Sequence, residues 1–164
     1  MSKMQPFWYF KPPPPKVIAY IEMVCPSDYG GMWPAVDDIS LIAISPEEER
    51  MVNGGLETGD FTGYTVAEDE ITSIFVHSGS YAVRLFAVEG NYLRQTFTTP
   101  ISVANVKSLT FWSLTWLQYT VFVNVTIGYT DGTKTVVPVS LLNVGGWEQW
   151  DLTSYLGKNC IEDV

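Results

Sequence analysis

Residues 120–129 read TVFVNVTIGY, residues 130–133 read TDGT, and residues 134–141 read KTVVPVSL. In the first segment, every second residue from Val121 is apolar or aromatic, which is the period of two of a half-buried antiparallel strand. The Asp-Gly pair at 131–132 is a typical hairpin turn, so we expect the two segments to pair. Pro138 cannot donate a ladder hydrogen bond, so the second segment is predicted to be an edge strand or to carry a bulge.

Working outward from this hairpin, the rest of the chain has the same character. Short β-rich segments separated by turn residues are typical of an all-β sandwich or barrel. Helical periodicity is almost absent; Ser45–Arg50 is the best candidate for one helical turn, with a solvated acidic loop as the alternative. The other predicted strands are Val17–Val24, Val36–Ile44, Phe61–Val66, Ile71–Val76, Tyr81–Val88, Leu93–Thr98, Val106–Ser113 and Trp147–Leu152.

Composition limits the function classes. The 164 residues are 46% hydrophobic and 14% aromatic, enough for one domain with a sizeable core. The net charge of −9 repels phosphate backbones, so we expect no nucleic-acid partner. One His and two Cys are too few for a four-ligand Cys/His zinc site, and no residue set suggests catalysis, so we expect no enzyme.

No segment is apolar enough to span a membrane, so no membrane span is expected. Residues 1–16 have neither the apolar region nor the small-residue cleavage site of a signal peptide. The chain is therefore expected either in the cytoplasm or, by an unusual route such as release at lysis, outside the cell or on a virion surface.

Several motifs from Asn53 onward resemble the galactose-binding-like jelly rolls of carbohydrate-binding modules. The most specific is the opening NGGLETGDFTG at 53–63; the weaker ones are HSGSYA at 77–82, QTF at 95–97, LTFW at 109–112, GW at 146–147 and WDLT at 150–153. The resemblance implies an all-β jelly-roll sandwich of antiparallel strands. It also implies that residues 17–164 form a single jelly-roll domain.

The order of the strands departs from this family. Its last two strands usually read like VIAIEI and IDDVSL, whereas here the matching segments, Val17–Val24 and Val36–Ile42, come first. Two arrangements follow. The sandwich is circularly permuted within one subunit, because short surface connections cost little; or it is completed by strand exchange between subunits, because a sheet that lacks strands exposes unpaired edges.

Residues 1–16 form an aromatic and proline-rich N-terminal arm. Four adjacent aromatic side chains are too apolar to hang in water and need a groove to fill. Four prolines then make a stiff, extended spacer of about 12 Å. Such an arm predicts a head-to-tail contact with a second copy of the chain, which propagates as a filament unless it closes into a ring. The arm residues are Phe7, Trp8, Tyr9, Phe10, Pro12, Pro13, Pro14 and Pro15.

The resemblance also implies a structural calcium ion. Such jelly rolls often hold one where the opening motif meets the closing strand, which here suggests Glu57 with Asp37 or Asp38, helped by backbone carbonyls near Gly55 and Ser80. Hard cations prefer such oxygen ligands. Alternatively, these are ordinary exposed carboxylates.

Two further pairs of residues are candidates. Cys25 and Cys160 would lie near the same strand end in a permuted sandwich and could form a disulfide, within or between subunits; the alternative is two free cysteines, the usual state inside cells. Trp33 and Trp116 lie near loops and are the better candidates for stacking on a sugar ring, whereas most other tryptophans are expected in the core.

These observations favour one function and leave one alternative. We expect a structural, self-assembling subunit of an extracellular filament, tube or virus surface appendage, whose partner is another copy of the same chain. The alternative is a carbohydrate-binding module, whose partner is a glycan.

Overall fold

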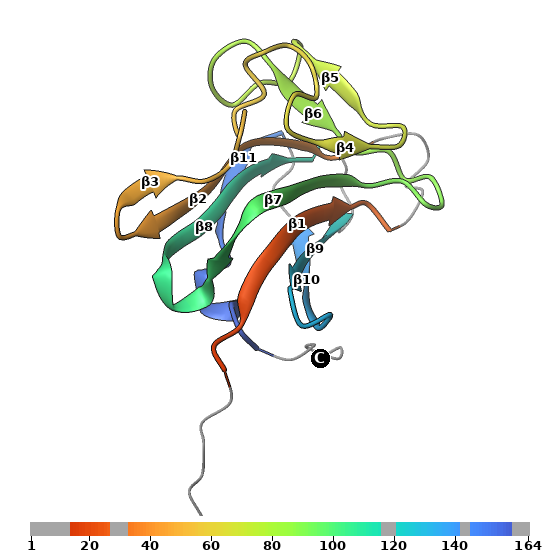
Figure 1. Ribbon diagram of the computed structural model, residues 1–164. Coiled ribbons are helices and arrows are strands. Elements are labelled where there is room, and N and C mark those ends of the chain that lie inside the picture. Colours follow the sequence, from red (N-terminus) through yellow and green to blue (C-terminus); the bar gives the residue numbers. More distant parts are fainter. Residues whose placement is uncertain (1–13, 27–32, 116–120, 142–144, 159–164) are drawn as a thin grey trace, which may run out of the picture.

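The computed structural model describes residues 14–26, 33–115, 121–141 and 145–158, which form a sandwich of two antiparallel sheets (Figure 1). The five-stranded sheet has the order β10-β9-β1-β7-β4, and the six-stranded sheet contains β11-β8-β2-β6-β5 with β3 paired to β2. The strands are β1 (Val17–Val24), β2 (Ala35–Ile44), β3 (Glu47–Glu49), β4 (Thr65–Val66), β5 (Glu70–Thr72), β6 (Ala82–Arg84), β7 (Leu93–Ser102), β8 (Val106–Leu114), β9 (Val121–Tyr129), β10 (Lys134–Leu141) and β11 (Trp147–Asp151).

The hairpin that decides the fold class is present. β9 and β10 pair from Val121↔Leu141 to Gly128↔Lys134. The alternate side chains of Val123, Val125 and Ile127 are fully buried in the core between the sheets. β10 lies at the edge of its sheet, so the missing N–H of Pro138 is tolerated there, as the sequence predicts.

The two N-terminal strands occupy central positions. β1 pairs with β7 on one side and β9 on the other. β2 pairs with β8, and with β6 and β3 at its two ends. Both strands therefore complete sheets of their own chain, and all the partners of β1 follow it by about 70 residues or more.

The predicted helical turn at Ser45–Arg50 is wrong. Ser45 and Pro46 form a turn, and Glu47–Glu49 return along β2 as β3. Three adjacent acids are tolerated in this strand because each carboxylate has a partner: Glu47 contacts Lys107, Glu48 contacts Arg50, and Glu49 accepts hydrogen bonds from Ser40 and Leu41.

Three predicted strands are shorter in the structure. Phe61–Val66 contributes only β4, Ile71–Val76 mainly β5, and Tyr81–Val88 only β6. Side chains replace part of the ladder here, because Asp69 accepts the Phe86 N–H and Asn91 accepts the Glu68 N–H. Such side-chain bonds to the backbone compete with regular pairing.

The described residues contain two short 3₁₀ helices, Val103–Asn105 and Thr153–Tyr155. Within the described part of the chain, no helix has the length and apolar character needed to cross a membrane.

Candidate functional site

Three carboxylates predicted as metal ligands lie around one loop, residues 77–81, on the outer face of the six-stranded sheet. The buried Asp37 of β2 accepts the N–H groups of His77 (2.9 Å) and Ser78 (3.2 Å). The neighbouring Asp38 contacts the ring Nδ1 of His77 at 2.7 Å and accepts the Ser78 hydroxyl at 2.9 Å. β2 thus fixes the start of the loop through two adjacent acids.

Glu57 fixes the end of the same loop. Its carboxylate accepts the Ser80 N–H at 2.9 Å and the Tyr81 N–H at 3.1 Å. The intervening Gly79 has a φ of +67°, a backbone conformation that L side chains rarely adopt, and a Cβ there would lie 2.3 Å from the Glu57 carboxyl carbon. Only glycine allows the loop backbone to lie this close to the carboxylate.

Burial dominates the electrostatics of Asp37. Loss of water raises its pKa to about 6, although the N–H groups of Ser78, Asp38 and His77 oppose the shift by stabilising the charged form. The nearby Asp38 carboxylate adds a smaller effect in the raising direction.

The structure brings the predicted side-chain ligands of calcium together, and their carboxylates accept hydrogen bonds from neighbouring residues. A Cβ on Gly55 would lie 3.3 Å from Asp38 Oδ1 and 3.6 Å from Glu57 Cγ, so these groups adjoin. Every carboxylate oxygen of Asp37, Asp38 and Glu57 has a hydrogen-bonding partner in the loop or in β2. Within the described ranges, no group of three His, Cys, Asp or Glu side chains is placed to hold a metal. The calcium ion therefore stays a prediction.

An aromatic cluster that sequence reasoning missed lies beside this loop. The His77 ring stacks on Trp112 at 3.8 Å between centroids and meets the edge of Trp147 at 5.5 Å. Trp112 follows the fully buried Phe111 on β8, so the alternation of the strand places its ring on the outer face. The alternation of this strand was the sequence signal from which the outward position of Trp112 could have been predicted.

The remaining predicted residues are not brought together by the described structure. The ring centroids of Trp33 and Phe86 lie 4.5 Å apart, and the Arg84 guanidinium carbon lies 5.2 Å from the centroid of the Trp33 ring. Cys25 is buried at the end of β1. Trp116, Cys160 and the arm residues 1–13 lie outside the described residues, so the disulfide and the arm contact stay predictions.

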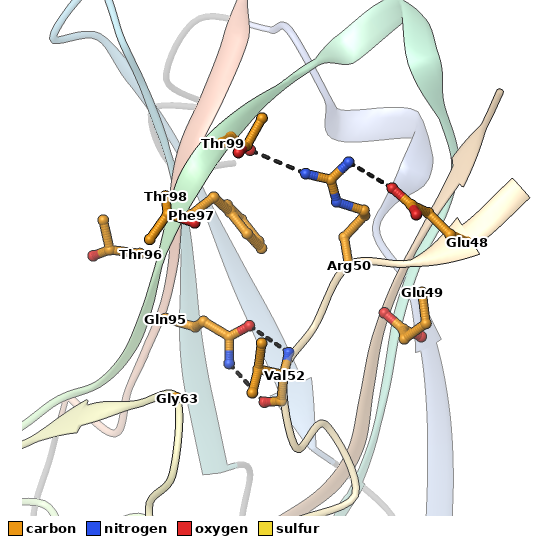
Figure 2. A pocket seen from close by; sticks show the side chains of 10 residues that line it. All are labelled: Glu48, Glu49, Arg50, Val52, Gly63, Gln95, Thr96, Phe97, Thr98 and Thr99. Atoms are coloured by element: carbon orange, nitrogen blue, oxygen red, sulfur yellow. Dashed lines mark hydrogen bonds and ion pairs between the residues drawn. The ribbon is translucent and has the colours of Figure 1, made fainter. Parts of the chain in front are cut away.

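A separate groove opens at the seam between the sheets, where β3 of one sheet faces β7 of the other (Figure 2). This seam groove has a volume of about 410 Å³. Arg50 crosses it, with its guanidinium 2.8 Å from the Glu48 carboxylate and 3.1 Å from the Thr99 carbonyl. The groove is lined by Glu48, Glu49, Arg50, Val52, Gly63, Gln95, Thr96, Phe97, Thr98 and Thr99.

At one end, the seam groove is closed by the Gln95 side chain, whose amide bonds to the backbone of Val52. The Gln95 amide accepts the Val52 N–H at 2.7 Å and donates to the Val52 carbonyl at 2.8 Å, as a backbone neighbour would. Gln95 is itself buried, so this closure is fixed. Above it, Phe97 is 8% exposed and Val52 is 54% exposed, which gives the groove an apolar floor.

Comparison of the chain with models of protein families, with curated protein sequences and with solved structures gives no match. The structure therefore assigns the protein to a fold class, the all-β sandwich of two antiparallel sheets with five and six strands. It does not assign the protein to a family. The described structure carries two distinctive features, a loop held by three acids beside stacked aromatic rings and an acidic groove at the seam.

Proposed function

We propose that this protein is a structural subunit that assembles with copies of itself, through its N-terminal arm, into an extracellular filament, tube or virus surface appendage. One observation carries the proposal: charge is divided sharply between arm and sandwich. Lys3, Lys11 and Lys16 are three of the nine basic residues, while all 18 acidic residues follow Lys16. A basic arm and an acidic body attract between copies.

The arrangement of β1 supports contact by the arm alone. β1 starts at Val17 and is already paired on both edges by strands of its own chain. Just before it, the Lys16 carbonyl accepts the Val103 N–H, and Pro14 and Pro15 are exposed. We therefore assign donation to residues 1–16, and β1 and β2 to their own subunit, as in the permuted arrangement that the motifs suggest.

The experiment is deletion of residues 1–16, with assembly followed by negative-stain microscopy and sedimentation. We expect the full chain to form filaments or tubes and the truncated chain to stay a folded β-rich monomer by circular dichroism. A matched control replaces Phe7–Phe10 by serines and keeps the length and charge of the arm. A full-length protein that remains monomeric at high concentration contradicts the proposal.

A second function, binding of a glycan, is favoured by the cluster of Trp112, His77 and Trp147. Aromatic rings that are partly exposed beside hydrogen-bonding groups suit a sugar ring, which has apolar faces and a polar rim. The test is tryptophan fluorescence titration with a panel of oligosaccharides. Trp147→Ala should abolish a response and Trp33→Ala should leave it; no response from any oligosaccharide rejects this function.

A further inference from the structure

We propose that the seam groove between β3 and β7 is the receptor for the N-terminal arm, residues 1–16, of a second copy of this chain. This inference rests on the proposed self-assembly and adds the surface that receives the arm. It follows from the strand edge at the groove, from the apolar floor, from the charge around it and from the position of the arm in the chain.

The groove runs beside an incompletely paired strand. Among the described residues, β4 pairs with β7 only at Leu93 and Arg94, so no described strand continues along that side of β7. The ladder on the other side is also irregular, since the partners of β1 pass from Ile101 to Thr96 between Ile18 and Tyr20. The Thr99 carbonyl is directed to the groove, where Arg50 donates to it. An extended segment gains hydrogen bonds at such an edge.

The floor of the groove suits aromatic side chains. Phe97 and Val52 present apolar surface, and Thr96, Thr98 and Thr99 are among the other lining residues. A volume of about 410 Å³ is within the range of ~300–1,000 Å³ typical of ligand pockets. The arm supplies the aromatic residues Phe7–Phe10, and burial of such rings away from water favours binding.

The rim of the groove has the charge opposite to the arm. Its charged lining residues are two glutamates, Glu48 and Glu49, and one cation, Arg50, so the lining is acidic by one charge. The third glutamate of β3, Glu47, is exposed next to the groove and pairs with Lys107. The arm has Lys3 and Lys11 on either side of its aromatic cluster and contains no acidic residue. Rim charges of opposite sign raise the association rate and set the register of the two partners.

The position of the arm favours a second copy over the same chain. β1 covers one edge of β7, whereas the groove lies along the other. Polyproline segments favour an extended form that rises about 3 Å per residue, so we expect four prolines in a row to direct the arm away from its own subunit. Thirteen residues before Pro14 reach up to about 40 Å, enough to span a subunit contact.

The first experiment is site-specific photocrosslinking in the assembled full chain. A benzophenone amino acid replaces Thr98, which is exposed and lines the groove, or Ile74, which is 77% exposed elsewhere, as the matched control. Mixing ¹⁴N and ¹⁵N chains separates crosslinks between copies from those within one. We expect mixed-isotope crosslinks from position 98 to peptides of residues 1–16, and none from position 74.

The second experiment is a charge exchange. Lys3→Glu/Lys11→Glu and, separately, Glu47→Lys/Glu48→Lys should each raise the critical concentration for assembly about tenfold, and combining them should restore assembly. The control Glu68→Lys/Glu89→Lys places the same charges on exposed acids outside the groove and should not rescue the arm variant.

These outcomes separate the two proposals. If the full chain assembles through its arm but position 98 gives no crosslink to residues 1–16 and the charge exchange fails to rescue, the groove assignment is wrong while the proposed function stands. If deletion of residues 1–16 leaves assembly intact, the proposed function itself fails.

Discussion

Glu57 illustrates how a single side chain can organise a loop. Its carboxylate receives two successive backbone N–H groups, and the only residue between Ser78 and Ser80 is a glycine that leaves room for it. Charged acceptors of this kind are stronger than neutral ones, so removing the charge affects both the hydrogen bonds and the position of the loop.

For Glu57→Gln we expect a loss of about 1–3 kcal/mol in the free energy of unfolding, because the amide NH₂ places a donor against the loop N–H groups. The measurement is urea denaturation in millimolar calcium and again in EDTA, with Glu89→Gln as the exposed control. The geometry predicts equal losses in both buffers. A loss confined to the calcium buffer would instead support the metal predicted from the sequence.

Asp69 is a second acid whose surroundings determine its behaviour. Burial raises its pKa to about 6, against the lowering effect of the Phe86 N–H and the Asn91 amide. Its Oδ2 atom is buried and has no hydrogen-bond partner among the described residues. The folded state therefore holds the proton more tightly than the unfolded chain, whose pKa is near 3.8.

The sign of the pH dependence follows. Because the folded pKa is the higher one, the free energy of unfolding rises as the pH falls from about 7 to about 4, by up to about 3 kcal/mol for this group. Asp69→Asn should flatten that part of the profile, measured by thermal melts across the range. A profile as steep as that of the unaltered protein would show that Asp69 does not titrate there.

At the scale of elements, β1 depends on a close approach to β9. A Cβ on Gly128 would lie 2.0 Å from the Tyr20 ring, which lies across β9. The Arg94 guanidinium lies over the Tyr20 ring, 4.6 Å from the ring centroid. Arg94 also forms an ion pair with Glu22. The glycine thus allows an aromatic side chain of β1 to cover its neighbouring strand.

Gly128→Ala should lower the free energy of unfolding by about 1–3 kcal/mol, because the methyl group displaces the Tyr20 ring. Combined with Tyr20→Ala, the loss should fall short of the sum of the single losses by more than about 0.5 kcal/mol. Chemical denaturation of the four proteins measures this coupling. Strict additivity would mean that the ring moves aside without cost.

At the scale of the whole molecule, the proposed self-assembly depends on the separation of charge between the arm and the sandwich. Acidic bodies repel one another, and this repulsion is common to every arm variant. The attraction between arm and body is specific to the arm lysines, so a comparison of two arms isolates it.

We therefore expect Lys3→Gln/Lys11→Gln to raise the critical concentration for assembly about tenfold at 0.1 M NaCl. At 1 M NaCl, where the screening length falls to about 3 Å, the two proteins should assemble alike. Light scattering against protein concentration measures both values. A difference that persists at 1 M would assign the role of the lysines to packing instead of charge.

The sequence by itself determined the local features of this protein. Alternation predicted β9, the Asp-Gly turn predicted β10, and β-rich composition between turn residues predicted β1 and β2, all nearly to the residue, because these signals act over short distances. It misassigned Glu47–Glu49, where pairing with β2 and partners such as Lys107, distant in the chain, stabilise a strand of three acids.

The contacts between segments far apart in the chain depend on the tertiary structure. It placed β1 between β7 and β9, stacked Trp112 on His77, and set β3 across the seam groove from β7. The family resemblance suggested that Glu57 lies near Asp37 or Asp38, but the shared contacts of these acids with residues 77–81 come from the tertiary structure. The physical reason is that strand order and the seam between sheets arise from burying a shared core between segments far apart in the chain, and the periodicity of a single segment carries no information about its neighbours.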